Sequence, residues 1–227
     1  MRLKITVFNF IVICLGFGCL HSSNAQVNDA GLWTSVTIEK KVFSKFSLAL
    51  NQELRFNENI SELGTAFTEL GGNYRIRKFL SIGASYRFIQ KRKVNDFYSM
   101  RHRYNIDLAI RHKIKNLSLA LRERFQTQYA DIYSREKGML PEHYLRSKLT
   151  LKYDLDKKYA PFLSGEFFFQ LSNVEGNELD NVRYAAGFDY EFSKRSSVEL
   201  FYVINKAFNV NEPVTDYVTG IGFNYSF

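Results

Sequence analysis

The sequence predicts an all-β protein, an antiparallel transmembrane β-barrel of 10 to 12 strands. Three observations support this prediction: an apolar segment at the amino terminus, apolar and polar residues that alternate from residue 32 onward, and a last strand with an aromatic face. Alternation at period two places successive side chains on opposite faces of a strand. A barrel wall in a membrane needs that division, with lipid outside and a polar interior.

Residues 1–25 have the pattern of a secretory signal peptide. Arg2 and Lys4 precede an apolar stretch, and residues 23–25 offer a cleavage site of the small-x-small type. The predicted mature chain therefore covers residues 26–227, which fit one barrel domain.

Two other interpretations of the amino-terminal segment remain open. A membrane anchor is disfavoured because the apolar run is short and contains Asn9. A lipid-anchored Cys19 is disfavoured because residues 16–18, Gly-Phe-Gly, depart from a lipobox. The chain has two cysteines, Cys14 and Cys19, and both precede the cleavage site. The processed protein would therefore contain neither a disulfide nor a cysteine metal site.

The charge balance of the chain is moderately basic. There are 31 Lys and Arg residues against 23 Asp and Glu, a formal net charge of +8, and removal of Arg2 and Lys4 lowers it to +6. Arginines interleaved with aromatics can indicate nucleic-acid binding. In an exported barrel they would face the lumen instead, so no nucleic-acid partner is expected.

Pro141, Pro161 and Pro213 fall near expected turns, where proline disrupts a sheet least.

Strand-like segments and turns succeed one another in a regular order. The clearest alternating segments are residues 46–56, 80–88, 103–111, 117–125, 149–153, 163–169 and 184–192. Short basic turns are expected near residues 43–45, 77–78, 113–116, 156–158 and 193–195. Longer polar loops are expected around residues 57–63, 92–98, 130–143, 173–181 and 208–215, with the largest excursion at 131–142. Short turns at one end and long loops at the other are typical of outer-membrane barrels, with the short turns periplasmic.

The number of strands is harder to predict than their existence. We count eleven strand-like segments, whereas bacterial single-chain barrels normally have an even number. Either residues 32–41 do not form a full wall strand or one pairing is missing.

The same alternation also fits a soluble, lipocalin-like barrel with an apolar interior. Segments of 11 to 14 residues favour the membrane barrel, because strands of that length cross a bilayer at the usual tilt.

The last strand of the chain has two contrasting faces. The apolar and aromatic face comprises Tyr217, Thr219, Ile221, Phe223, Tyr225 and Phe227. The other face is small and mostly polar. An aromatic carboxyl terminus resembles the terminal strand by which the barrel-assembly machinery recognises outer-membrane barrels. This resemblance implies an assembly signal formed by Tyr217, Gly220, Phe223, Tyr225 and Phe227.

Charged side chains would lie in the lumen if the apolar faces point to lipid. The predicted lumen cluster comprises Glu53, Glu69, Arg87, Arg101, Arg103, Asp107, Arg111, Arg122, Arg124 and Glu166. Arginine keeps its charge, and its planar fork can bridge several carboxylates. The cluster therefore either fills the lumen as an ion-paired plug or lines a narrow aqueous pathway that favours anions. Glu123 breaks the alternation, since strict parity places this carboxylate outside unless a bulge turns it inward.

A catalytic site in this barrel would depend on its histidines. His102, His112 and His143 follow the signal segment, and Ser99 and Ser147 lie near expected strand ends. After the signal segment there is no His-x-Ser pair and no recognisable acyl-hydrolase motif, so the sequence favours a protein without catalytic activity. Three scattered histidines without cysteine do not make a closed metal site. No metal and no cofactor are expected.

Four short segments carry a family resemblance. They are Gly31-Leu32-Trp33, residues 51–56 (Asn-Gln-Glu-Leu-Arg-Phe), residues 85–88 (Ser-Tyr-Arg-Phe) and residues 100–104 (Met-Arg-His-Arg-Tyr). Their arrangement is similar to an uncharacterised outer-membrane barrel family labelled domain of unknown function twenty-four-ninety. The resemblance implies a barrel fold and a location in the cell outer membrane of Gram-negative bacteria. It implies no catalytic residues.

The resulting hypothesis is a monomeric integral barrel in contact with outer-membrane lipids. It would act as a structural protein or as a small-solute pore that favours anions. Two alternatives stay open: an outer-membrane lipid-modifying enzyme, and a soluble periplasmic, lipocalin-like binder of apolar ligands.

Overall fold

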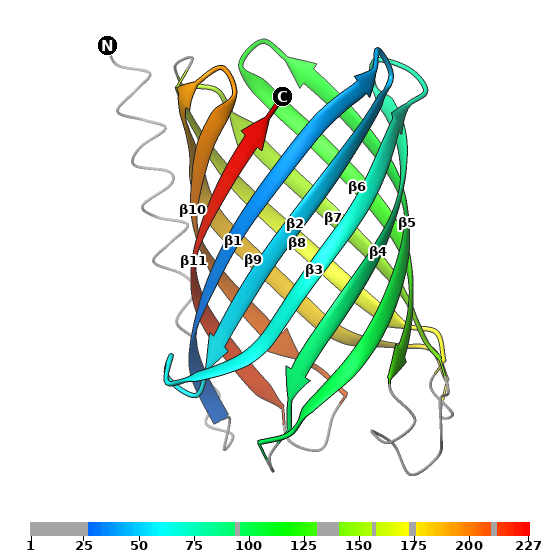
Figure 1. Cartoon of the computed structure of the whole chain (residues 1–227), viewed down its shortest axis with the longest axis vertical. Helices are drawn as coiled ribbons and strands as arrows, with labels where there is room; N and C mark the ends of the chain where they lie inside the picture. The colour runs from blue at the N-terminus through cyan, green and yellow to red at the C-terminus, as the bar shows by residue number, and fades with distance from the viewer. Residues whose placement is uncertain (1–26, 94–95, 131–140, 156–157, 173–175, 210–212) are drawn as a thin grey trace.

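The computed structural model describes residues 27–93, 96–130, 141–155, 158–172, 176–209 and 213–227. Within these residues the chain forms eleven β-strands that close into a barrel (Figure 1). The strands are β1 (Val27–Phe43), β2 (Phe46–Asn57), β3 (Glu62–Arg75), β4 (Leu80–Arg92), β5 (Tyr98–Ile114), β6 (Leu117–Ala130), β7 (Glu142–Tyr153), β8 (Tyr159–Gln170), β9 (Glu178–Ser193), β10 (Ser196–Ala207) and β11 (Val214–Ser226). The described residues include no helix long and apolar enough to cross a membrane.

The barrel closes through a parallel seam between its first and last strands. Consecutive strands pair antiparallel, but β1 pairs parallel with β11, and Trp33 lies opposite Gly220 in this register. A barrel with an odd number of strands must contain one such parallel pair. The structure thus confirms the barrel and shows that residues 32–41 are part of a full wall strand. The start of β1 lies at the long-loop end, whereas β11 finishes at the short-turn end (Figure 1).

The connections differ in length at the two ends, as predicted. Two residues join β1 to β2, β5 to β6 and β9 to β10, all at the short-turn end. The other two connections at this end, 76–79 and 154–158, have four and five residues, whereas those at the opposite end run from four residues (58–61) to eleven (131–141). The predicted excursion at 131–142 lies largely outside the described residues, and so does the predicted signal peptide at 1–25.

The loop-end turn after β2 has an unusual backbone. Glu58, Asn59 and Ile60 all have positive φ angles, of 52°, 57° and 70°. The carboxylate of Asp29 on β1 accepts hydrogen bonds from the backbone N–H groups of Glu58 (3.1 Å) and Asn59 (2.9 Å). The N–H of Ile60 donates to the carbonyl of Ala30 (3.1 Å). This turn is therefore held against the start of β1, although non-glycine residues adopt such angles at a cost.

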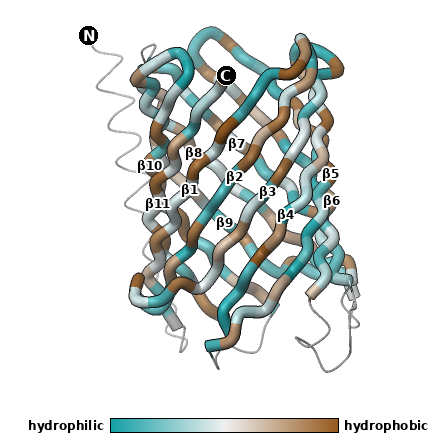
Figure 2. The backbone as a smooth tube through the Cα atoms, in the orientation of Figure 1, coloured by the Kyte–Doolittle hydropathy of each residue, from teal (hydrophilic) through white to brown (hydrophobic). Residues whose placement is uncertain are grey.

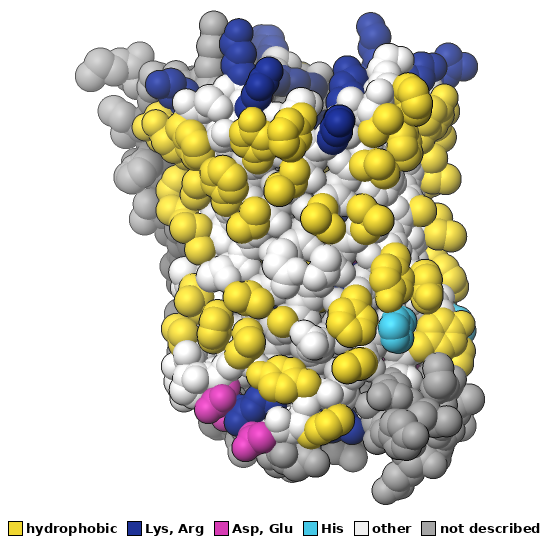
Figure 3. Space-filling model, in the orientation of Figure 1, with side chains coloured by type: hydrophobic (Ala, Val, Ile, Leu, Met, Phe, Trp, Pro, Cys, Tyr) yellow, Lys and Arg dark blue, Asp and Glu magenta, His cyan; other side chains and the backbone are white. Residues whose placement is uncertain are grey.

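Hydrophobic and hydrophilic residues alternate along the strands (Figure 2). Leu108 on β5 points outward and is 44% exposed, whereas Arg124 on the neighbouring strand points inward and is 7% exposed. Hydrophobic side chains cover much of the outer face in Figure 3, and Lys and Arg side chains gather at its short-turn end. This orientation is the opposite of a soluble barrel with an apolar interior, so the lipocalin-like alternative is not supported.

The carboxyl-terminal strand has the two faces that its sequence predicts. Tyr217 and Phe223 of β11 are exposed on the outer surface, and Gly220 faces the lumen. The N–H of Phe227 donates to the carbonyl of Glu39 on β1 (2.9 Å), and its ring makes an edge contact with that of Tyr225. The last residue thus extends the hydrogen bonding between β11 and β1. The role of this strand as an assembly signal stays a prediction.

Candidate functional site: the charged lumen

The lumen contains a cavity of about 630 Å³, here called the central cavity. Among the described residues, ten basic and five acidic side chains line it. The basic ones are Arg55, Arg87, Lys91, Arg101, Arg103, Arg122, Arg124, Arg146, Lys148 and Arg183, and the acidic ones are Glu53, Glu142, Glu166, Asp180 and Glu199. The cavity therefore carries a surplus of positive charge, which attracts anions into a low-dielectric space.

A second cavity of about 300 Å³, here called the turn-end cavity, lies toward the short turns. Arg75, Arg77 and Arg111 contribute to its lining. It shares two residues with the central cavity, Arg122 and Lys148. The two cavities thus meet at these side chains, and both are lined mainly by basic rather than acidic groups.

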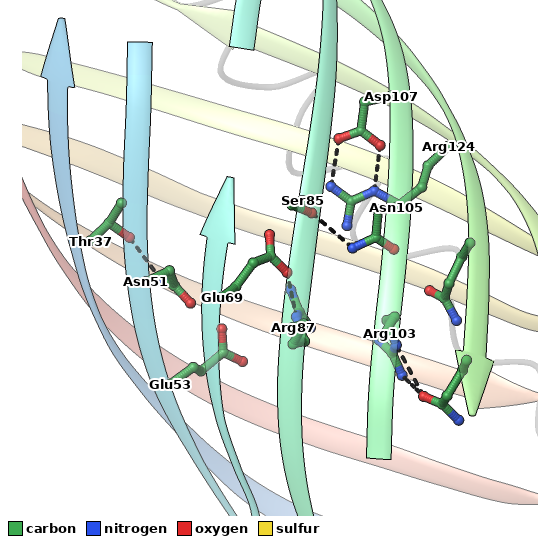
Figure 4. Close-up of polar contacts among 12 residues, drawn as sticks. Thr37, Asn51, Glu53, Glu69, Ser85, Arg87, Arg103, Asn105, Asp107 and Arg124 are labelled. Atoms are coloured by element: carbon green, nitrogen blue, oxygen red, sulfur yellow. Dashed lines mark hydrogen bonds and ion pairs between the residues drawn. The ribbon is translucent and has the colours of Figure 1, made fainter. Parts of the chain in front are cut away.

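Several of the predicted cluster residues form ion pairs between neighbouring strands (Figure 4). Arg124 binds Asp107 with two parallel hydrogen bonds, Nε to Oδ1 and Nη2 to Oδ2, both 2.6 Å. Arg87 donates to Glu69 from the adjacent strand. Glu53 accepts a hydrogen bond of 2.6 Å from Arg55 on its own strand. The first two pairs link β5 to β6 and β3 to β4 on the lumen side, and all three neutralise part of the basic charge.

Glu166 of β8 is the centre of a larger group. It is 3% exposed, and its Oε1 accepts hydrogen bonds from Arg146 (Nε 3.1 Å, Nη2 2.8 Å) and Arg122 (Nη2 2.7 Å). The Nη1 atom of Arg183 lies 4.0 Å from Glu166 Oε2. One buried carboxylate is therefore shared by three guanidinium groups, which leaves an excess of positive charge at mid-lumen.

Other basic groups that line the central cavity form no ion pair with a carboxylate among the described residues. Arg103 donates from Nε (3.0 Å) and Nη2 (2.5 Å) to the neutral amide oxygen of Gln128. Among the described residues, the ammonium groups of Lys91 and Lys148 make no hydrogen bond or ion pair. These charges face the central cavity and are available to a solute.

Aromatic rings line the lumen opposite the arginine-rich strands. The guanidinium of Arg55 lies 3.8 Å from the centre of the Trp33 ring, and that of Arg183 lies 5.0 Å from it. The Phe201 ring lies against the wall because its neighbours on both adjacent strands are Gly187 and Gly220. A Cβ atom at Gly220 would lie 2.0 Å from Phe201 Cζ. These glycines therefore make space for an aromatic ring inside the barrel.

The charge cluster predicted from the sequence did not include every basic residue of the central cavity. It omitted Arg55, Lys91, Arg146, Lys148 and Arg183, which all line the central cavity. The alternation along each strand could have identified these residues as lumen-facing. For example, Arg146 and Lys148 alternate with Leu145 and Leu149, which point outward. Which of these residues lie next to one another on neighbouring strands depends on the strand register, and the alternation does not specify that register.

Glu123 faces outward, as strict parity indicates. Its neighbours show no bulge on β6, and its carboxylate accepts a hydrogen bond of 2.6 Å from the hydroxyl of Ser147 on β7. A carboxylate on an apolar outer face is costly without a partner. The serine supplies one.

The histidines and serines of the proposed enzyme do not come together. His102 Nδ1 lies 2.7 Å from the Tyr86 hydroxyl, and His143 Nδ1 lies 3.1 Å from the Thr127 hydroxyl. Ser147 contacts Glu123, and the hydroxyl of Ser172 accepts a hydrogen bond from the backbone N–H of His143 (3.0 Å), not from its ring. Nor does any group of three His, Cys, Asp or Glu residues in the described part of the chain have the arrangement of a metal site.

A closed, mostly antiparallel barrel with an apolar exterior and a charged lumen has the architecture of an outer-membrane β-barrel. The profile of the family described as "Protein of unknown function (DUF2490)" matches residues 30–215, and the chain belongs to this family. No curated protein matches the sequence.

Solved structures show the same fold at low sequence identity. The NanC porin in a rhombohedral crystal form has a TM-score of 0.57 and 11% identity, over 88% of this chain and 98% of that one. The β domain of the Bordetella autotransporter BrkA has a TM-score of 0.53 and 10% identity, over 82% of this chain and 86% of that one. Because these sequence identities are low, the similarity between this chain and the solved structures shows a shared fold and nothing further.

Proposed function

We propose that this protein is an outer-membrane pore for small anionic solutes. The observation that supports the proposal most strongly is the central cavity, with ten basic and five acidic side chains among its described lining residues. Its connection to the turn-end cavity through Arg122 and Lys148 extends this basic surface toward the short turns. A surplus of one sign along a low-dielectric wall raises the local concentration of oppositely charged solutes.

Conductance in a planar bilayer tests the pore. With a KCl gradient across the membrane, we expect a reversal potential of the sign given by a chloride preference. Replacing two basic groups without carboxylate partners, Lys91→Gln with Arg103→Gln, should reduce that preference. Lys45→Gln, in an exposed turn outside both cavities, is the matched control and should leave it unchanged. A wild-type barrel that inserts but passes no ions would show that the lumen is a closed plug.

The proposed setting is the outer membrane. The exposed apolar side chains would contact outer-membrane lipids, and the aromatic end of β11 would be recognised by the barrel-assembly machinery. The barrel would act as a monomer, since one chain encloses the whole lumen. Detergent-dependent extraction and a gel mobility that shifts on heating test this placement. Extraction by salt alone would contradict it.

A further inference from the structure

Arg122 of β6 and Lys148 of β7 lie directly opposite each other in the register of their strands. Like charges in that position destabilise a pair of strands unless an anion lies near both. They are also the two residues that the central and turn-end cavities share. Any solute that passes between the cavities meets both charges.

The carboxylate nearest to this pair does not neutralise it. Glu166 lies opposite Lys148 in the register of β7 and β8, but its Oε1 atom is bound by Arg146 and Arg122. With Arg183 4.0 Å away on the other side, four basic groups surround this single acid. Glu199 lines the same cavity without an ion pair to Lys148, and Asp189 is paired with Lys152.

The two arginines on Glu166 are held to different degrees. Arg146 is 7% exposed and donates from three nitrogens, to Glu166 and to Gln126. Arg122 is 28% exposed and makes one hydrogen bond, from Nη2 to Glu166. Its Nε is buried and lacks a partner among the described residues. Arg122 is thus the guanidinium that can turn to another carboxylate at least cost.

We propose that Arg122 and Lys148 form a carboxylate-binding step between the two cavities. This proposal rests on the proposed pore function and names its solutes as small organic carboxylates. The solute carboxylate would take the place of Glu166 on Arg122 and accept a further hydrogen bond from the Lys148 ammonium. Glu166 stays with Arg146, so the solute is released when Arg122 returns to it.

The carboxylate-binding step can be tested by measuring how acetate blocks the chloride current through the barrel. Acetate should reduce the wild-type current at concentrations at which sulfate, with a different oxygen arrangement, does not. Because charge-assisted hydrogen bonds are the strong ones, Lys148→Gln and Arg122→Gln should each weaken the acetate block about tenfold. Lys152→Gln is the matched control, on the same strand and face but paired with Asp189, and it should leave the block unchanged.

Fluorescence of Trp33, the single tryptophan, separates this proposal from the pore. Trp33 lines the central cavity beside Arg183, which approaches Glu166, so iodide quenching reports on anions there. Acetate should protect Trp33 from iodide in the wild type and in Lys152→Gln, but not in Lys148→Gln. If acetate protects Trp33 from iodide in a barrel that passes no current, the carboxylate-binding step is supported and the proposed pore function is overturned. A conducting barrel in which Lys148→Gln and Lys152→Gln are blocked equally by acetate would overturn the binding step and leave the pore standing.

Discussion

The guanidinium of Arg55 on β2 lies 3.8 Å from the centre of the Trp33 ring on β1, inside the barrel. This contact joins the arginine-rich wall of the lumen to its aromatic wall. A cation over a tryptophan face contributes about 0.5–2 kcal/mol, depending on how far it is shielded from water. It also makes the single tryptophan a reporter of lumen charge.

Trp33 should be quenched by iodide more than by caesium at equal concentration. The surplus of basic side chains around the central cavity concentrates anions and repels cations. Stern–Volmer constants of the reconstituted protein measure this difference. As a control, the pair Trp33→Phe and Leu108→Trp moves the tryptophan to the outer surface, where the preference should disappear. Equal quenching of Trp33 by both ions would contradict a basic lumen.

Gly220→Ala should destabilise the barrel by about 1–3 kcal/mol, the usual cost of overpacking. The added Cβ would lie 2.0 Å from the Phe201 ring, so the ring must move. Gly165→Ala is the matched control, because the nearest atom to its Cβ, Tyr184 Cδ1, lies 4.0 Å away. Urea unfolding in lipid vesicles measures both. Phe201→Leu in the Gly220→Ala background should restore part of the loss, and an unchanged double variant would argue against this contact.

Ile60→Gly should stabilise the protein by about 1 kcal/mol, because relief of about 1–2 kcal/mol of left-handed backbone strain exceeds the entropic cost of a glycine, about 0.5–1 kcal/mol. Ile60 has a φ of 70° and its side chain is exposed at the loop end. Ile76 in the connection between β3 and β4 is also exposed but has no positive φ. Ile76→Gly should therefore destabilise by about 0.5–1 kcal/mol. Equal effects of the two substitutions in urea titrations would refute the strain at Ile60.

Ser147→Ala should destabilise the barrel by about 1–3 kcal/mol, because the outward carboxylate of Glu123 then loses its hydrogen-bond partner. Glu123→Leu combined with Ser147→Ala should recover this loss, since both groups become apolar on an apolar face. The double-mutant cycle, followed by unfolding in vesicles, gives the coupling between the two residues. Additive effects would mean that the hydrogen bond contributes nothing in the membrane.

Glu166→Gln should destabilise the protein by about 3–5 kcal/mol, as is usual when one partner of a buried ion pair is removed. Arg122, Arg146 and Arg183 would then face one another without a carboxylate between them. Glu53→Gln removes one partner of a less buried pair and should cost less. If both variants unfold at the same urea concentration, Glu166 is not the centre of the charge network.

The sequence by itself determined the class of fold and the orientation of the wall. Alternation is a local property: Leu108 and Asp107 must point to opposite sides of β5 whatever that strand pairs with. For the same reason the outward position of Glu123 and the lumen parity of Arg122 and Arg124 were predictable. The turns followed from composition, since the short basic segments fall between the alternating ones.

Only the tertiary structure decided the number of wall strands, the parallel seam and the membership of the charge network. An odd count is permitted because β1 and β11 pair in parallel, and no local pattern in either strand specifies its partner. Arg122, Lys148 and Glu166 meet because β6, β7 and β8 align in one register. Register is set by closure of the whole barrel, since tilt and stagger must agree around the ring. The sequence could therefore predict that these charges face inward, but not which of them share a carboxylate.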